Sequence, residues 1–236
     1  MVKKGKKRVV VIIQARMNSE RLPGKVMLDL SGKTTLSRVI ERVKNSKNID
    51  GICVATSSSK ADDVIEKEAI KNEVQVFRGK LDDVLDRYCK AAEMMKADYV
   101  IRVTGDNPLT EPRFIDICAK EITGKDLDYV TIEETPYGSG AEAISRNALV
   151  SAFEKADKEE KEHVTMHVYR RPASYRICII KPDQKLRRPD MRLTLDTLND
   201  YVLLSRIFSH FSKKPSRNIK LESVIAFIDG INGGKK

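Results

Sequence analysis

Short apolar runs alternate with stretches of helical periodicity along the first half of the chain. The apolar runs have the length of strands and lie at residues 9–13, 52–55, 74–77, 99–103 and 129–132. Between them, apolar side chains recur with helical spacing at residues 35–45, 61–71, 83–95 and 113–122. Alternation of this kind is typical of a mostly parallel sheet that helices cover on both faces. The pattern therefore predicts an α/β fold whose ligands bind beyond the carboxyl ends of the strands.

The pattern loosens after residue 133, where a loop rich in turn residues occupies positions 134–140. The elements expected beyond it are short strands at 143–144, 175–180 and 193–195, and helices at 147–155, 159–169, 200–211 and 221–228. We expect a single domain over residues 9–231, with flexible tails at residues 1–8 and 232–236.

The formal net charge of +10 suggests nucleic-acid binding as one possible function. Seven of the cations lie in the two tails, which leaves a surplus of three for the body of the chain. There is no zinc-finger spacing, no basic region joined to heptads and no aromatic RNA-binding segment. The sequence therefore argues against nucleic acid as the partner, although a non-catalytic nucleic-acid-binding protein stays open as an alternative.

No apolar run approaches the roughly 20 residues that cross a bilayer, so no membrane span is predicted and the cytoplasm is the expected location. The four cysteines form no C-x-x-C pair, which argues against a structural zinc site.

Three cations gather in the loop that follows the first predicted strand. Arg16, Arg21 and Lys25 lie within twelve residues of its end, and Gly24 fits a tight turn there. A nucleoside triphosphate needs several fixed cationic donors and usually Mg²⁺. No Walker A motif is present: Gly32, Lys33 and Thr34 resemble its end, but Met27 stands where its first glycine would be required. We interpret the cationic loop as a triphosphate-binding loop; the alternative is a solvated basic loop.

Two aspartates follow predicted strands. Asp106 lies just after the run at 99–103, beside a glycine and a proline that fix the turn, and Asp196 follows the run at 193–195. Carboxylates at one edge of a sheet could share a Mg²⁺ ion with no histidine or cysteine ligand. The alternative to a metal-binding role for Asp196 is that this residue only begins a helix.

His163 and His167 are four residues apart on one face of the helix predicted at 159–169. The zinc-protease pattern is absent because Val164 replaces its glutamate, so we expect no zinc, but His163 could reach a substrate. Arg78 and Asp83 follow the third strand and could contact a base or ribose, or form only a turn and a helix start.

Together these stretches resemble the spore-coat-polysaccharide cytidylyltransferase-like family, which is related to CMP-Kdo and acylneuraminate cytidylyltransferases. The resemblance is carried by residues 13–16 with 21–25, 54–57, 76–79 with 82–88, 102–109, 162–165 and 192–197. It implies a three-layer α/β/α nucleotide-diphospho-sugar-transferase-like fold with a mixed, mostly parallel sheet, often in a homodimer. It also implies Mg²⁺-dependent transfer of CMP from CTP to a small acidic acceptor (an acidic sugar, a phosphonate or a phosphorylated small molecule), with release of pyrophosphate.

The resemblance also implies roles for individual residues. Arg16, Arg21 and Lys25 would bind the triphosphate, with Arg16, Lys25 and Asp106 most directly involved in catalysis. The base and ribose would be bordered by Ala15, Thr56, Arg78 and Asp83. Asp106 and Asp196 would hold Mg²⁺. The loop at 138–142, with Gly138 and Glu142, would face the acceptor together with His163, in a subregion of about 134–180 that also serves dimerisation.

One departure from the family's usual pattern bears on the acceptor, and one missing motif bears on a rival hypothesis. Family members of the spore-coat type commonly carry an aspartate shortly before the position of Glu142, whereas this chain has Ser139, Gly140 and Ala141, so we expect a different acceptor. A glycosyltransferase on the same fold is the rival hypothesis, but such enzymes usually place an Asp-x-Asp metal motif after a strand. Here Pro108 stands at the second aspartate position.

Overall fold

A single seven-stranded sheet runs through the molecule in the order β3-β2-β1-β4-β6-β5-β7. The computed structural model describes residues 6–233 of the chain. The strands are β1 (Val9–Gln14), β2 (Gly51–Ser57), β3 (Gln75–Gly79), β4 (Tyr99–Thr104), β5 (Tyr129–Ile132), β6 (Glu142–Ser145) and β7 (Ile177–Ile180). β6 is antiparallel to β4 and β5, and the other neighbouring strands are parallel. The expected mixed, mostly parallel sheet is confirmed.

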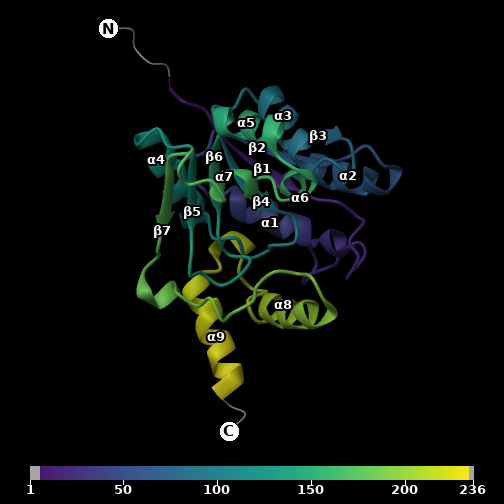
Figure 1. Ribbon diagram of the computed structural model, residues 1–236. Coiled ribbons are helices and arrows are strands. Elements are labelled where there is room, and N and C mark those ends of the chain that lie inside the picture. The colour runs from purple at the N-terminus through teal and green to yellow at the C-terminus, as the bar shows by residue number, and fades with distance from the viewer. Residues whose placement is uncertain (1–5, 234–236) are drawn as a thin grey trace.

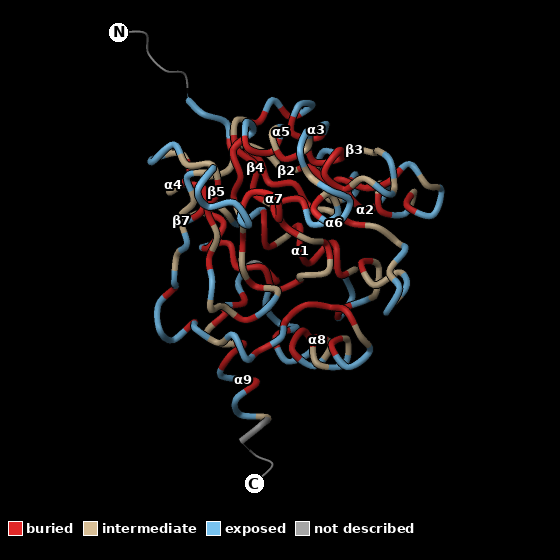
Figure 2. The backbone as a smooth tube through the Cα atoms, in the orientation of Figure 1, coloured by how far each residue is buried: buried red, intermediate tan, exposed pale blue. Residues whose placement is uncertain are grey.

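Helices cover both faces of this sheet (Figure 1). The α-helices are α1 (Thr35–Val43), α2 (Asp63–Lys71), α3 (Val84–Met94), α4 (Pro112–Gly124), α5 (Arg146–Lys155), α6 (Lys158–Glu162), α7 (Met166–Tyr169), α8 (Leu198–His210) and α9 (Leu221–Gly233). Alternate residues of each strand join different cores. Val11 packs with α1, α2 and α4, whereas Ile12 packs with α3, α5 and α7. Figure 2 shows these central strands buried, as expected for a sheet covered on both sides.

The carboxyl-terminal helices α8 and α9 lie below the sheet in Figure 1 and extend the core that contains α1. Arg42 of α1 is fully buried where they meet. Its guanidinium donates to the backbone carbonyls of Thr110, Ser216 and Ile219 and pairs with Glu111. Burial lowers the pKa of Arg42 to about 10. Because each of the three guanidinium nitrogens has at least one acceptor, this arginine joins distant loops without leaving a buried charge unpaired.

The single helix expected at 159–169 is wrong. Two short helices, α6 and α7, lie there instead, and Val164 between them has a left-handed backbone with φ of 55°. The charged periodicity continues across this junction, which is why the sequence pattern conceals it. As a result His163 and His167 do not share a helix face: His163 is exposed at the junction, whereas His167 is buried.

The strand expected at 193–195 is also wrong. The segment joins its neighbours through single backbone hydrogen bonds, from Leu193 N to the oxygen of Tyr137 (2.7 Å) and from Leu195 N to the oxygen of Asp106 (2.8 Å). Gly138 makes this approach possible, since its φ is 95° and a Cβ there would lie 2.7 Å from the nitrogen of Thr194. Asp196 thus reaches the edge of the sheet on an irregular segment rather than at a strand end.

The ends of the chain are only partly described. Residues 1–5 and 234–236, which belong to the expected tails, lie outside the described residues. Lys6 pairs with Asp50 at 2.6 Å, and the backbone nitrogen of Arg8 donates to Asp98 at 2.7 Å, so this part of the expected tail contacts the body. Within residues 6–233, no helix combines the length and the apolar character needed to cross a membrane.

Candidate functional site

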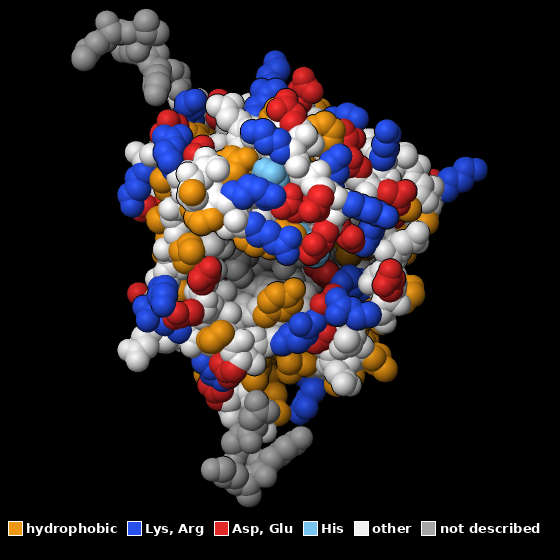
Figure 3. Space-filling view, in the orientation of Figure 1, with side chains coloured by type: hydrophobic (Ala, Val, Ile, Leu, Met, Phe, Trp, Pro, Cys, Tyr) orange, Lys and Arg blue, Asp and Glu red, His pale blue; other side chains and the backbone are white. Residues whose placement is uncertain are grey.

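A cavity of about 930 Å³ opens beyond the carboxyl ends of β1 and β4 and beside the start of β6. Figure 3 shows this face of the molecule hollowed near its middle, with acidic and basic side chains around the hollow. Its lining comes from stretches far apart in the sequence, chiefly within residues 14–26, 102–107, 131–142, 162–163 and 194–196. The position agrees with the expectation that ligands bind at the carboxyl edge of a parallel sheet.

The ends of β1 and β4 touch at the back of the cavity. Gln14 and Thr104 are partners in the parallel ladder, and the nitrogen of Gly105 donates to the oxygen of Gln14 at 2.8 Å. A Cβ on Gly105 would lie 3.0 Å from the Cβ of Ala15 and 3.1 Å from the oxygen of Gln14. The glycine therefore lets the loop that carries Asp106 lie directly against the cationic loop.

Lys25, Asp106 and Asp196 meet at one end of the cavity. The Lys25 ammonium donates to Asp106 Oδ2 and, at 2.6 Å, to Asp196 Oδ1. Burial by itself would lower the pKa of Lys25, but the charge of Asp106 and hydrogen bonds to both carboxylates outweigh it and raise the pKa. Burial likewise acts to raise the pKa of Asp196, yet the hydrogen bond and charge of Lys25 leave it lowered. The site thus holds two carboxylate groups around one ammonium.

The two expected arginines lie at the mouth of the cavity. Arg16 pairs with Glu162 at 3.4 Å and Arg21 with Asp196 at 3.2 Å, and both guanidinium groups remain substantially exposed. Ala15 also lines the cavity. Arg21 and Lys25 therefore meet at Asp196, whereas Arg16 contacts Glu162 beside His163; all three line the cavity, where each can turn toward a polyanion.

Three of the residues expected around the base and ribose do not line the cavity. Thr56 is fully buried within β2. Arg78 is held between Asp63 and Glu66, with both contacts at 2.7 Å. Asp83 caps the first turn of α3 with its carboxylate. Their polar groups are engaged in the scaffold, or buried within it, rather than directed at the cavity.

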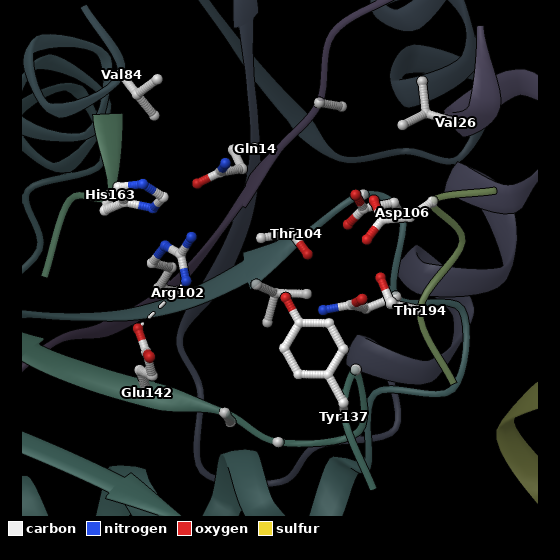
Figure 4. Close-up of a pocket in the computed structure, with 18 of the residues that line it drawn as sticks. Gln14, Val26, Val84, Arg102, Thr104, Asp106, Tyr137, Glu142, His163 and Thr194 are labelled. Carbon is white, nitrogen blue, oxygen red and sulfur yellow. Dashed lines mark hydrogen bonds and ion pairs between the residues drawn. The ribbon is translucent and has the colours of Figure 1, made fainter. Parts of the chain in front are cut away.

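The residues expected to face the acceptor do line the other end of the cavity. Gly138 and Glu142 belong to the loop and the start of β6, and His163 lies at the junction of α6 and α7. Glu142 Oε2 lies 3.3 Å from a nitrogen of Arg102 and accepts a hydrogen bond from Thr165 at 2.9 Å. Figure 4 shows Glu142 and His163 on opposite sides of Arg102.

Sequence reasoning missed Gln14 and Arg102, which line the cavity between its two ends. A signal was present in the sequence: each is a polar residue at the end of, or inside, an otherwise apolar strand. Such a position leaves a polar side chain either paired within the core or directed at a ligand.

A family model described as cytidylyltransferase matches residues 10–224. The chain belongs to the cytidylyltransferase family. It is 35% identical over 213 residues to the spore coat polysaccharide biosynthesis protein SpsF of Bacillus subtilis, covering 88% of this chain and 89% of SpsF. Membership confirms the resemblance and identifies a nucleotidyltransferase rather than a glycosyltransferase.

Two solved structures have a fold similar to that of this chain. A cytidylyltransferase from Leptospira borgpetersenii superposes with a TM-score of 0.90 at 28% identity, covering 97% of this chain and 96% of the other. A CMP:2-keto-3-deoxy-manno-octonic acid synthetase complexed with CTP has a TM-score of 0.68 at 18% identity, with 87% and 100% coverage, and shares the fold.

The carboxylates of this cytidylyltransferase suit a divalent cation. Asp106 and Asp196 each place an oxygen on the same Lys25 ammonium, so they can meet at one cation. The neighbouring Asn107 Oδ1 is buried and has no hydrogen-bond partner among the described residues. Oxygen donors of this kind are those that Mg²⁺ prefers. Within residues 6–233, no three acidic, histidine or cysteine side chains are placed so that they could hold a metal ion together, so two carboxylates alone would need ligands of another kind, such as Asn107, phosphate or water.

Proposed function

We propose that this protein transfers CMP from CTP to a small acidic acceptor and releases pyrophosphate, with Mg²⁺ as its cofactor. The observation that carries the proposal is the convergence of Lys25, Asp106 and Asp196 at the sheet edge, beside two further cations. One relative of the same fold was solved with CTP, and SpsF is named for polysaccharide biosynthesis. An acidic sugar destined for a polysaccharide therefore leads the possible acceptors; a phosphonate or a phosphorylated small molecule fits the same chemistry.

In this reaction an acceptor oxygen attacks the α-phosphorus of CTP in line with the leaving group. The new oxygen–phosphorus bond forms as the bond to pyrophosphate breaks, and the acceptor's proton leaves to solvent. Arg16, Arg21 and Lys25 bind the β- and γ-phosphates and stabilise the charge that accumulates on pyrophosphate. Lys25 does so by leaving its carboxylate partners for the triphosphate. Mg²⁺, held by Asp106 and Asp196, supplies further neutralisation of phosphate charge when bound.

The opposite end of the cavity receives the acceptor. Gly138, Glu142 and His163 contribute its walls, and the segment around residues 134–180 supplies most of that end. Ala15 is retained as a neighbour of the nucleotide because it lines the cavity. We do not propose Thr56, Arg78 or Asp83 as neighbours of the nucleotide, because none of these residues lines the cavity. The expected homodimer and cytoplasmic location stay predictions.

Asp106→Asn tests the proposal. The amide keeps the shape of the side chain but removes the charge that faces Lys25 and the phosphates. We expect kcat for pyrophosphate release to fall about a thousandfold, which corresponds to roughly 4 kcal/mol of lost transition-state stabilisation. Asp183→Asn, at an exposed aspartate outside the cavity, is the matched control and should keep wild-type turnover.

The assay supplies each of CTP, UTP, ATP and GTP with a panel of sugar acids, phosphonates and phosphorylated polyols, and measures pyrophosphate. Turnover with CTP and an acidic acceptor is the expected result. Near-wild-type activity of Asp106→Asn, or release of a nucleoside diphosphate from a nucleotide sugar, would refute the proposal. Binding to unrelated DNA that weakens steeply with salt would instead favour the nucleic-acid alternative.

A further inference from the structure

A row of polar side chains crosses the sheet at the floor of the cavity. On the face covered by α3, α5 and α7, alternate strand residues such as Ile12 and Ile144 are apolar and buried. The same alternation reaches polar residues next to the cavity: Gln14 on β1, Arg102 and Thr104 on β4, and Glu142 on β6. Gln14 is paired with Thr104 in the ladder, and Arg102 with Glu142. These four side chains therefore lie side by side on one face, as Figure 4 shows.

Arg102 is a member of this row whose hydrogen bonding is incomplete. Its contact with Glu142 uses Nη1 and is 3.3 Å long, whereas charge-assisted bonds are usually about 2.7–2.9 Å. Its Nε is buried and has no acceptor among the described residues. Arg42, by contrast, donates to three carbonyls and a carboxylate.

A buried N–H group without a hydrogen-bond partner favours binding of a ligand that can accept its hydrogen bond. A guanidinium has five N–H donors in a fixed plane, and the edge formed by Nε and Nη2 matches the two oxygens of a carboxylate. Leaving a buried donor unsatisfied is unfavourable, and a ligand that accepts its hydrogen bond recovers this free energy when it binds there. Glu142 is held in place by Thr165 as well as by Arg102, so it fixes the guanidinium while its Nε side remains unused.

Gln14 also has a buried polar atom without a hydrogen-bond partner. Its Oε1 is buried and has no hydrogen-bond partner among the described residues, and it lines the cavity next to Arg102 (Figure 4). An amide oxygen accepts from a hydroxyl. Arg102 and Asp106 line the same cavity, so one molecule bound there can face both the guanidinium and the phosphate end.

We propose that Arg102 binds the carboxylate of the acceptor, and that Gln14 accepts from a hydroxyl close to that carboxylate. The acid group of the acceptor is then held at Arg102 while one of its hydroxyl groups faces the phosphate end. The inference rests on the proposed function, because it assigns the residues that hold the acceptor of that reaction. Arg102 thereby determines specificity for an acid over the corresponding neutral polyol.

The test compares D-gluconate with D-glucitol, which has the same carbon chain but no carboxylate. The protein is saturated with a CTP analogue that carries an α,β-methylene bridge, so that the triphosphate end is filled. The Nε–Hε resonance of Arg102 is observed by NMR and assigned from its loss in Arg102→Lys. We expect gluconate to shift this resonance and glucitol to leave it unmoved. Arg102→Lys should weaken gluconate binding at least tenfold, whereas Arg206→Lys, at an exposed arginine outside the cavity, should not.

A purely structural role predicts a different result. If Arg102 only braces Glu142, gluconate binds equally well after the substitution, and the proposal is overturned. It is also overturned if 50 mM gluconate leaves the Arg102 resonance in place or shifts only residues of the loop at 15–25. The double variant Arg102→Met with Glu142→Gln leaves no lone buried charge and should fold, yet lose the gluconate site. Failure to release pyrophosphate from CTP with any acceptor would refute the proposed function and leave this binding result standing.

Discussion

Replacement of Lys25 by methionine should destabilise the ligand-free protein. Methionine keeps the length of the side chain but removes the ammonium that Asp106 and Asp196 share. The Asp106 and Asp196 side chains are only 19% and 9% exposed, so water cannot fully replace the lost partner. The substitution therefore leaves two carboxylate groups close together in a poorly solvated site.

The size of the effect follows from the partners that remain. Asp196 keeps Arg21 at 3.2 Å and Arg192 at 2.5 Å, so its charge stays compensated. Asp106 has no other cationic partner among the described residues. One pair of unit charges about 4 Å apart contributes roughly 4 kcal/mol at an effective dielectric constant near 20. Breaking a buried pair typically costs about 3–5 kcal/mol, and the partial exposure of Asp106 favours the lower value, about 3 kcal/mol.

Thermal and urea unfolding measure this loss. For a chain of this length, about 3 kcal/mol corresponds to a decrease in Tm of roughly 6–12 °C. Lys33→Met is the matched control: Lys33 pairs with Glu41 at the surface, and we expect less than about 1 kcal/mol. Millimolar Mg²⁺ should restore more stability to Lys25→Met than to the wild type, because the cation occupies the place of the ammonium. A Tm for Lys25→Met within 1 °C of the wild type would refute the reasoning.

Two further predictions concern the stability of the scaffold, and the first has a matched control variant. Gly138→Ala places a Cβ 2.7 Å from the Thr194 nitrogen, so backbone must move, and we expect about 3 kcal/mol of lost stability together with lost turnover. Gly32→Ala has a similar φ but no atom within 4 Å, and should cost about 1 kcal/mol with turnover unchanged; equal losses in the two variants would contradict the steric argument. Burial acts to raise the pKa of Glu160, but hydrogen bonds from Arg171 and His167 lower it to about 2. Its stabilising contribution is therefore present above about pH 4.5 and lost as the pH falls toward 2. Glu160→Gln should flatten the acid limb of the stability–pH curve, and an unchanged limb would contradict this assignment.

The parts of the fold that follow from local sequence were predictable. The apolar runs of strand length predicted β1 and β4. Because neighbouring parallel strands end at the same edge of a sheet, the contact between Lys25 and Asp106 could also be predicted. Asp196 lies beside Asp106 at the edge of the sheet, as predicted, but on an irregular segment rather than at the end of a strand. Its segment is held by single hydrogen bonds to other loops and by the close approach at Gly138, and neither leaves a periodic trace in the sequence.

Other features depend on contacts that a sequence pattern does not record. The break between α6 and α7 requires a left-handed residue at Val164, a β-branched residue that rarely adopts that conformation. The role of Arg102 was hidden because a charged residue inside a strand is identified as a site only when its neighbours are known. Here Glu142 is its ladder partner in a strand whose reversed direction the sequence did not indicate.

The reversed direction of β6 also separates the two ends of the cavity along the chain. Residues 15–25 and 105–107 line the end that we propose binds phosphate, whereas the loop at 134–140 and the first residue of β6 line the opposite wall. That loop can change in length or composition while the β1–β4 contact stays as it is, which would allow a change of acceptor without rebuilding the phosphate end. Gly138 is a fixed point, because it lies directly against the backbone of Leu193 and Thr194, next to the hydrogen bond between Tyr137 and Leu193. Loop exchange in this enzyme should therefore be designed on either side of Gly138 and never through it.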